Sequence, residues 1–228
     1  MSSVSSESKH HIFRDVPNVD LYTSKNPRDY IFFCAASYDE CDTDSGGVNP
    51  GVFSNWFDER KVESNTYDDE GHVGLDGHVY WCVEQEMMYG KAKLFGDQNA
   101  MKKILGEKKS PLKLKKHGRK VKNYDDAQWS QERYAIVLNA CLAKFLQHDK
   151  LRKILINTGN KIIVEAAWYD KVWGVGFSEW TASPEDGGHR GIKKSDDEFD
   201  AGPSEWPENP GNYLGRILME VRDELANI

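Results

Sequence analysis

The sequence has no apolar stretch that approaches the roughly 20 residues needed for a membrane-spanning helix. Its first residues, MSSVSSESKHH, are polar and lack the apolar core of a secretory signal peptide. Cysteine is scarce, with 4 residues among 228, and no two of them form a CxxC pair. We therefore expect a soluble intracellular protein of the cytoplasm or nucleus, with reduced thiols and no membrane partner.

The sequence also lacks residues at the spacing typical of metal ligands, because the only close histidine pair, His10-His11, lies in a polar terminal segment. We expect no metal, no cofactor and no obligate protein partner. The net charge of -7 argues against a general nucleic-acid-binding protein. The charged residues are unevenly distributed along the chain. Residues 102–122 hold ten Lys or Arg and one acid, whereas residues 179–208 hold nine acids and three bases.

Tryptophan, by contrast, is abundant, with 7 residues, and 39% of the chain is hydrophobic, enough for a core. Apolar side chains recur at helical spacing. Asp97 is expected to cap a further short helix, and Asp125 with Gln128 resembles a capping box at the start of the longest one. The helical ranges are 83–95, 97–105, 125–147, 149–156 and 214–225. Strands are expected at 30–36 and 161–167, with a hairpin turn at Asp76-Gly77. These patterns predict one mainly helical α+β domain with a small β-sheet and a central helical bundle.

The most informative pattern lies in the predicted helix 83–95. Glu84 and Lys91 share one face with the apolar side chains of Met88 and Phe95. Buried charges are costly unless they are paired or used, so a structural Glu–Lys pair is the ordinary interpretation. About 10 Å of helical rise separates the two backbones, however. The side chains can converge on a ligand between them more easily than on each other, which favours a pocket.

A second group of candidates lies near the predicted strand 161–167, which itself contains Glu165. Asp170 precedes Trp173 and the glycines at 174 and 176, where the backbone can approach a ligand closely. A Trp-filled turn with a capping Asp is an equally good interpretation. At the end of the basic run, Arg119 has a guanidinium group whose paired N–H donors suit a phosphate. A run of basic residues usually forms only a solvated surface, however.

Seven motifs stand in the order and spacing of the NADAR family, which the chain therefore resembles. They are FSNWF (53–57), VEQEMMYGKAKLFGD (83–97), HGR (117–119), WSQER (129–133), AKF (143–145), LINTGNKIIVEAAWYDKVWGVG (155–176) and NYLGRILMEVRDEL (212–225). Gln85 departs from the family pattern, because many members have His there. We expect residues 1–28 to form a flexible arm and residues 29–228 to form the NADAR-like domain, with insertions at about 58–72 and 178–210.

The resemblance implies a hydrolase that cleaves an N-glycosidic bond. It places Glu84, Lys91 and Asp170 at the family's catalytic positions. Two carboxylates in different environments suit sugar chemistry, so Glu84 is assigned as the leading acid/base and Asp170 as the second carboxylate. Lys91 either holds phosphate or polarises the leaving group, or it attacks the opened sugar as a Schiff base. The residues implied to bind substrate are Asn55, Trp56, Gly118, Arg119, Trp129, Trp173, Gly174 and Asn212.

Within that site, Trp129 or Trp173 is expected to stack on the base. Arg119, with Lys115 or Lys116, is expected to bind phosphate.

The sequence leaves three hypotheses about the function open. The preferred one removes ADP-ribose from guanine in DNA, RNA or a nucleotide, with ADP-ribose as the product. It is preferred because no riboflavin-synthesis domain accompanies the sequence and the basic run suits a nucleic-acid backbone. The second cleaves a ribosylamine phosphate of riboflavin synthesis. The third is a module that binds ADP-ribose or NAD without turnover, which would not need Glu84 and Lys91 together.

Overall fold

The computed structural model describes residues 30–34, 50–62, 71–167, 170–175, 178–181, 190–195, 198–200 and 211–228. The predicted arm lies outside these residues, as does most of the first predicted insertion. The helices are α1 (Val83–Leu94), α2 (Gln98–Gly106), α3 (Pro111–Gly118), α4 (Asp126–Gln147), α5 (Asp149–Ile156) and α6 (Tyr213–Leu225), with short 3-10 helices η3 (Pro50–Phe53) and η4 (Glu59–Lys61). In this part of the chain, no helix is long and apolar enough to cross a membrane.

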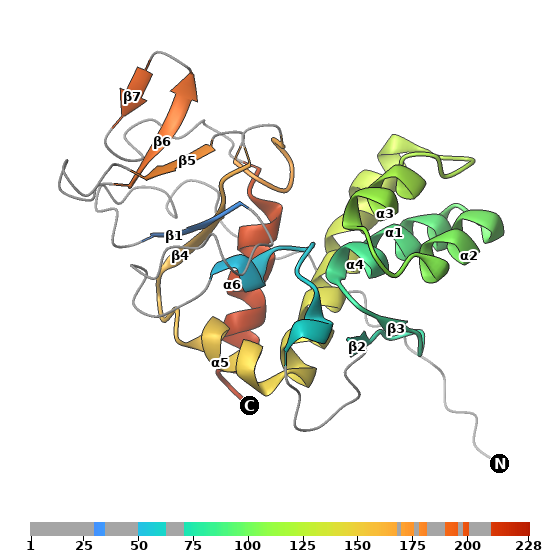
Figure 1. Cartoon of the computed structure of the whole chain (residues 1–228), viewed down its shortest axis with the longest axis horizontal. Coiled ribbons are helices and arrows are strands. Elements are labelled where there is room, and N and C mark those ends of the chain that lie inside the picture. The colour runs from blue at the N-terminus through green and yellow to red at the C-terminus, as the bar shows by residue number, and fades with distance from the viewer. Residues whose placement is uncertain are drawn as a thin grey trace, which may run out of the picture.

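The longest helix, α4, runs through the centre, where it contacts α1 on one side and α6 on the other (Figure 1). Helices α2 and α3 pack on α1, and α5 packs on both α4 and α6. As predicted, Asp97 and Asp125 cap α2 and α4 by accepting backbone N–H groups of Ala100 and Gln128. Helix α3 was not expected from the sequence, because its Lys-rich stretch buries only Leu114 and Gly118.

The strands form three small sheets. Strands β1 (Tyr30–Phe33) and β4 (Ile162–Glu165) pair in parallel, in a register that sets Phe33 beside Glu165. Strands β2 (His72–Val73) and β3 (Val79–Tyr80) form the predicted hairpin. Strands β5 (Ser178–Thr181), β6 (Arg190–Ser195) and β7 (Glu198–Asp200) form an antiparallel sheet within the second predicted insertion. The mainly helical α+β class is confirmed, with the strands divided among separate sheets.

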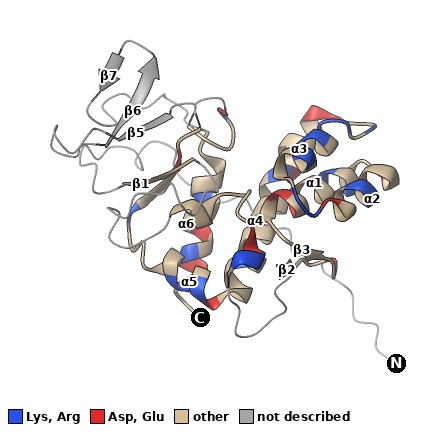
Figure 2. Ribbon diagram, viewed as in Figure 1, with Lys and Arg blue, Asp and Glu red and all other residues tan. Residues whose placement is uncertain are grey.

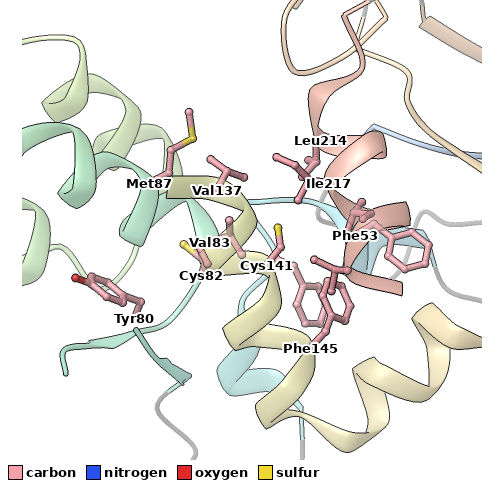
Figure 3. Close-up of a cluster of buried hydrophobic side chains, with 14 of the residues drawn as sticks. Phe53, Tyr80, Cys82, Val83, Met87, Val137, Cys141, Phe145, Leu214 and Ile217 are labelled. Carbon is pink, nitrogen blue, oxygen red and sulfur yellow. The ribbon is translucent and has the colours of Figure 1, made fainter. Parts of the chain in front are cut away.

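One hydrophobic core joins α1, α4 and α6 with the segment around η3 (Figure 3). Val83 and Met87 reach it from α1, Val137 and Phe145 from α4, and Ile217 from α6. The thiols of Cys82 and Cys141 are buried in the same cluster, and Cys34 is exposed at the end of β1. The core therefore holds α1, the helix that also bears Glu84 and Lys91, in place.

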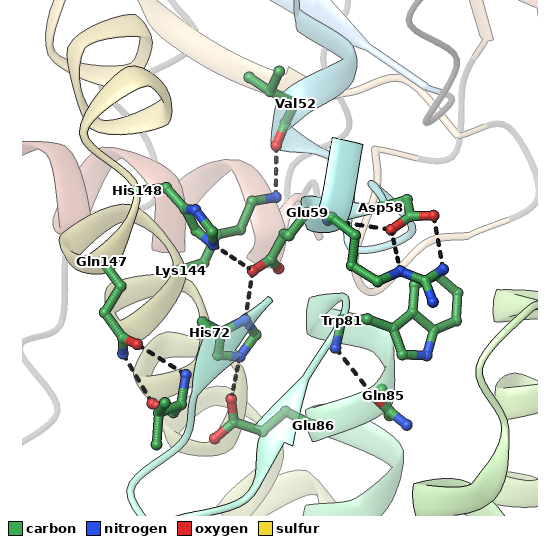
Figure 4. Close-up of polar contacts among 12 residues, drawn as sticks. Val52, Asp58, Glu59, His72, Trp81, Gln85, Glu86, Lys144, Gln147 and His148 are labelled. Carbon is green, nitrogen blue, oxygen red and sulfur yellow. Dashed lines mark hydrogen bonds and ion pairs between the residues drawn. The ribbon is translucent and has the colours of Figure 1, made fainter. Parts of the chain in front are cut away.

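A polar network is buried beside this core (Figure 4). Glu59 accepts hydrogen bonds from His72 Nδ1 at 2.7 Å and from His148 Nε2 at 3.2 Å, and His72 Nε2 lies 2.7 Å from a carboxylate oxygen of Glu86. Burial alone would raise the pKa of Glu59, but the charge and hydrogen bond of His72 and the hydrogen bond of His148 lower it to about 2. Glu59 and Glu86 likewise hold the pKa of His72 at about 9, against the effect of burial. The network is therefore charged at neutral pH.

Lys144 adds a cation to this buried network. Its ammonium donates to the carbonyl oxygens of Val52 at 2.6 Å and Ser54 at 3.4 Å, while burial lowers its pKa. Glu59 supplies the opposing charge. Lys144 thus ties the last turn of α4 to the segment that immediately precedes Asn55 and to the Glu59 carboxylate.

Candidate active site

A cavity of about 580 Å³ opens where the end of β1, residues 54–56, α1, α3, the first turn of α4 and the loop after β4 converge. This volume is within the range of small-molecule sites. The structure brings together most of the side chains that the sequence analysis assigned to a site. Nine of those eleven residues line the cavity: Asn55, Trp56, Glu84, Lys91, Gly118, Arg119, Trp129, Asp170 and Trp173.

Glu84 and Lys91 both line this cavity from α1, as the helical pattern indicated. Among the described ion pairs, none joins the two side chains. The Lys91 ammonium instead lies over the ring of Tyr124, 4.1 Å from its centroid, and 5.2 Å from the ring centroid of Trp129. Burial lowers the pKa of Lys91, and the nearby charge of Arg119 acts in the same direction. A lysine of lowered pKa is a better nucleophile at neutral pH.

Glu84 is 5% exposed and lies in the first turn of α1, where its backbone N–H donates to the carbonyl oxygen of Asn55 at 2.9 Å. Burial, helped by the charge of Asp170, raises the pKa of Glu84 to about 7. Lys115, Arg119 and a hydrogen bond from the Trp56 side chain oppose this shift. A carboxyl group with this pKa can both donate and accept a proton at neutral pH.

Asp170 faces the same cavity from the loop after β4. Its Oδ1 accepts the backbone N–H groups of Val172 at 3.0 Å and Trp173 at 2.9 Å. The sequence left two interpretations of Asp170 open, a capping residue of a turn and a residue of a ligand site. The carboxylate does both: it closes the turn and it lines the cavity. These two hydrogen bonds fix the direction of the carboxylate before any ligand arrives.

The cationic wall of the cavity comes from α3. Arg119 follows the last residue of the helix, and the Lys115 ammonium lies 5.9 Å from the ring centroid of Trp56. Gly118 makes this wall possible, because a Cβ there would lie 1.9 Å from the sulfur of Met88 on α1. The role of Gly118 is therefore to let α3 approach α1 closely enough for its cations to reach the cavity.

Gly174 and Asn212 are not among the lining residues and lie behind β4 instead. Asn212 adopts a left-handed backbone with φ 45°, a conformation that Asn tolerates well. Its side chain accepts the N–H of Glu165 and donates to the carbonyl oxygen of Ile163, both at 2.9 Å. A Cβ on Gly174 would lie 2.8 Å from the carbonyl oxygen of Glu165. Both residues thus hold the end of β4, and through it Glu165.

Glu165 lines the cavity but was not assigned to the site from the sequence. Its position at the carboxyl end of a predicted strand was a usable signal, since ligands of parallel sheets bind outside the carboxyl ends of the strands.

Gln85, at the position where many family members have His, does not line the cavity. Its side chain donates to the carbonyl oxygen of Ile104 at 2.9 Å and accepts the N–H of Trp81 at 3.1 Å. Within the described residues, no group of three or more His, Cys, Asp or Glu side chains is placed to hold a metal ion.

The stability of the fold should depend on the protonation of the glutamate carboxyl groups that line the cavity. Burial raises the pKa of Glu84 from 4.5 to about 7 and that of Glu165 from 4.5 to about 8. The folded state therefore keeps protons that the unfolded chain releases, so stability falls as pH rises from about 4.5 to 8. The double change of Glu84 and Glu165 to Gln should leave the Tm nearly unchanged at pH 4.5. At pH 8.5 it should raise the Tm by several degrees, since 1 kcal/mol corresponds to roughly 2–4 °C for a chain of this size. Thermal unfolding at the two pH values checks this, and an equal effect at both would contradict it.

Comparisons with known proteins identify the family of this chain. A family model described as the NADAR domain matches residues 42–226. The chain is 34% identical over 195 residues to N-glycosidase R617 of Acanthamoeba polyphaga mimivirus, covering 86% of this chain and 95% of that protein. It is 34% identical over 180 residues to protein irg-1 of Caenorhabditis elegans, covering 76% and 75%.

Its fold matches the NMR structure of Escherichia coli YbiA with a TM-score of 0.55 and 23% sequence identity, covering 87% of this chain and 85% of that one. This likeness concerns the fold alone. Since the family model spans most of the sequence and a relative is 34% identical over 86% of the chain, the chain belongs to the NADAR family.

Proposed function

We propose that this protein hydrolyses an N-glycosidic bond and that the bond joins ADP-ribose to a guanine base. The observation that carries the proposal is the grouping, around one cavity, of carboxyl groups, cationic side chains and tryptophan rings. Each kind of group matches one part of such a substrate: the sugar carbon and its leaving nitrogen, the diphosphate, and the flat base. The relative named N-glycosidase R617, which aligns over nearly all of its length, supports the reaction class.

The carboxyl groups would act at the sugar. Cleavage of the C1′–N bond develops positive charge on the sugar, leaves a nitrogen that needs a proton, and requires an oriented water or nucleophile. Glu84, with a pKa of about 7, exchanges protons readily at neutral pH and is the leading acid/base. Asp170, held in place by two backbone N–H groups, is the second carboxylate and faces the developing charge.

The cations and rings would bind the remainder of the substrate. Arg119 and Lys115 of α3 would hold the diphosphate, because a guanidinium donates two parallel hydrogen bonds to phosphate oxygens. Trp173 would stack on the base. It is half-buried and packs edge-on against Tyr213 at 6.1 Å, which leaves a supported ring beside the cavity. Trp129 lies near the ammonium of Lys91 and closes the site on that side.

A nucleic-acid substrate is favoured by the surface next to the cavity. Figure 2 shows Lys and Arg gathered over α2, α3 and the loops beside them, although the protein as a whole is acidic. Exposed members of this basic surface are Lys108, Lys109, Lys113, Lys116 and Lys120. Because it adjoins Arg119, a strand whose modified guanine enters the cavity would lay its phosphates along α3.

The proposal is tested by giving the purified protein three ligands: an oligonucleotide with ADP-ribosylated guanine, the corresponding ADP-ribosylated nucleotide, and a pyrimidine ribosylamine phosphate. Chromatography and mass spectrometry identify the products. Release of ADP-ribose together with unmodified guanine nucleotide or oligonucleotide is the expected result. Cleavage of the ribosylamine alone would overturn the substrate class, and tight ADP-ribose binding without any turnover would overturn the enzymatic function.

Lys91 has two possible roles, which borohydride distinguishes. If its amine attacks the opened sugar at C1′, the resulting imine is reduced in single turnover and Lys91 gains the mass of the sugar fragment. If it only holds phosphate or polarises the leaving group, no adduct forms. In both cases Lys91→Ala should lose activity while remaining folded, because the half-buried side chain lies over the ring of Tyr124 and lines the cavity. Full activity of Lys91→Ala would remove this residue from the mechanism.

A further inference from the structure

Glu165 shares the cavity with Glu84 and Asp170 but comes from a different element, the end of β4. Its backbone is held on both sides. The N–H donates to Asn212 at 2.9 Å, and the carbonyl oxygen accepts the N–H of Val175 at 3.0 Å. Its side-chain Oε2, in contrast, is buried and forms no hydrogen bond. A buried polar atom without a partner destabilises a fold, so the arrangement needs an explanation other than stability.

The surroundings of Glu165 keep its carboxyl group neutral. Burial raises its pKa to about 8, the charges of Asp170 and Glu84 add to this effect, and Lys115 opposes it. Three carboxyl groups around one cavity cannot all ionise easily, and Glu165 has the higher pKa of the two shifted groups. The other titratable side chains that line the cavity come from the end of β1, α1, α3 and the loop after β4: Cys34, Lys91, Arg119 and Lys171.

We propose that Glu165 is a further catalytic residue, the general acid that protonates the nitrogen of the leaving base; this inference rests on the proposed N-glycosidase function. Glu165 lines the cavity and has a carboxyl oxygen without a protein partner, so its neutral carboxyl group has a proton to give to a ligand. The assignment divides the roles of the two glutamates. Glu165 supplies a proton at the leaving group, and Glu84 removes one from the attacking water.

The step balances in atoms and electrons. The C1′–N bond breaks, its electron pair stays on the guanine nitrogen, and the proton of Glu165 joins that nitrogen. Water gives its hydroxyl to C1′ and its remaining proton to the Glu84 carboxylate. The proton then passes from Glu84 back to Glu165, which restores both groups. One water is consumed, and ADP-ribose and the unmodified base are released.

The test compares Glu165→Gln with wild type on two substrates that share the ADP-ribose part. One carries guanine, and the other carries 4-nitrophenolate, which leaves without protonation. With the guanine substrate, kcat should fall by about 100-fold or more, while KM changes little. With 4-nitrophenolate, the variant should cleave at a rate close to that of wild type. The kcat of wild type on the guanine substrate should also decline above about pH 8, where Glu165 loses its proton.

Further variants separate catalysis from structure. Glu165→Asp keeps a proton donor and should recover part of the lost activity, whereas Glu224→Gln, which removes an exposed carboxylate from α6, should behave as wild type. Wild-type rates for Glu165→Gln on guanine, or equal losses on both substrates, would overturn the assignment. If wild type itself cleaves no ADP-ribosyl guanine, the proposed function fails first and the inference falls with it.

Discussion

Changing Glu84 to Gln is expected to lower kcat by about 10²–10⁴-fold, with the fold intact. A carboxamide has nearly the same shape as the carboxyl group and can still accept the hydrogen bond from the Trp56 side chain. It cannot exchange a proton, however, and its neutral oxygen stabilises a positive sugar poorly. KM should change much less than kcat, since the phosphate and base contacts of the substrate are made by other residues. Steady-state kinetics with the cleaved substrate measures both parameters.

Glu86→Gln is the matched control for this change. Glu86 lies two residues further along α1, on a different face, where its carboxylate contacts His72 Nε2 at 2.7 Å. This variant should lose some stability but keep the wild-type rate per folded molecule. Comparable kcat values for Glu84→Gln and wild type would remove Glu84 from the acid/base role, and an equal loss in both variants would show a general effect of altering α1.

Glu59→Gln is expected to lower the free energy of unfolding by about 3–5 kcal/mol. The Glu59 carboxylate is the charge that faces His72, His148 and Lys144 in the buried network (Figure 4). Without it, the Lys144 ammonium and the His72 ring must either remain charged in an apolar surrounding or release protons that they otherwise hold. Urea unfolding measures the loss, as a lower midpoint at an unchanged m-value.

The neighbouring residue provides the control. Asp58→Asn also removes a carboxylate, but Asp58 pairs with Arg60 at 2.8 Å near the surface, so the loss should stay below about 1 kcal/mol. A loss for Glu59→Gln no larger than that of Asp58→Asn would show that the buried network does not stabilise the fold.

The pKa shifts of the same network also give the direction in which the stability of the wild type changes with pH. The raised pKa of His72 favours folding below pH 6.5 and this contribution is lost toward about pH 9, whereas that of Glu59 is lost as pH falls from 4.5 toward about 2.

Local patterns allowed much of this architecture to be predicted. The hairpin at Asp76-Gly77, the capped starts of α2 and α4, and the apolar stripe of α6 depend on residues close together in the chain, and each is present. Helix α3 was missed because it buries little of its surface, and a Lys-rich stretch resembles a solvated face. The separation of the strands into three sheets could not be predicted, because strand pairing depends on contacts between distant segments.

The sequence by itself determined that Glu84 and Lys91 lie on one face of α1, because the period of a helix is fixed by its backbone geometry. It also determined, through the ordered motifs, the family and the candidate residues of the site. Only the tertiary structure decided that Lys91 rests over Tyr124 and Trp129 instead of pairing with Glu84. It alone brought Glu165 to the same cavity as Glu84 and Asp170, since β4, α1 and the loop after β4 are distant in the sequence and surround this cavity only in the folded chain. The physical reason is that burial and nearby charge, which set the protonation of these carboxyl groups, are properties of the assembled cavity.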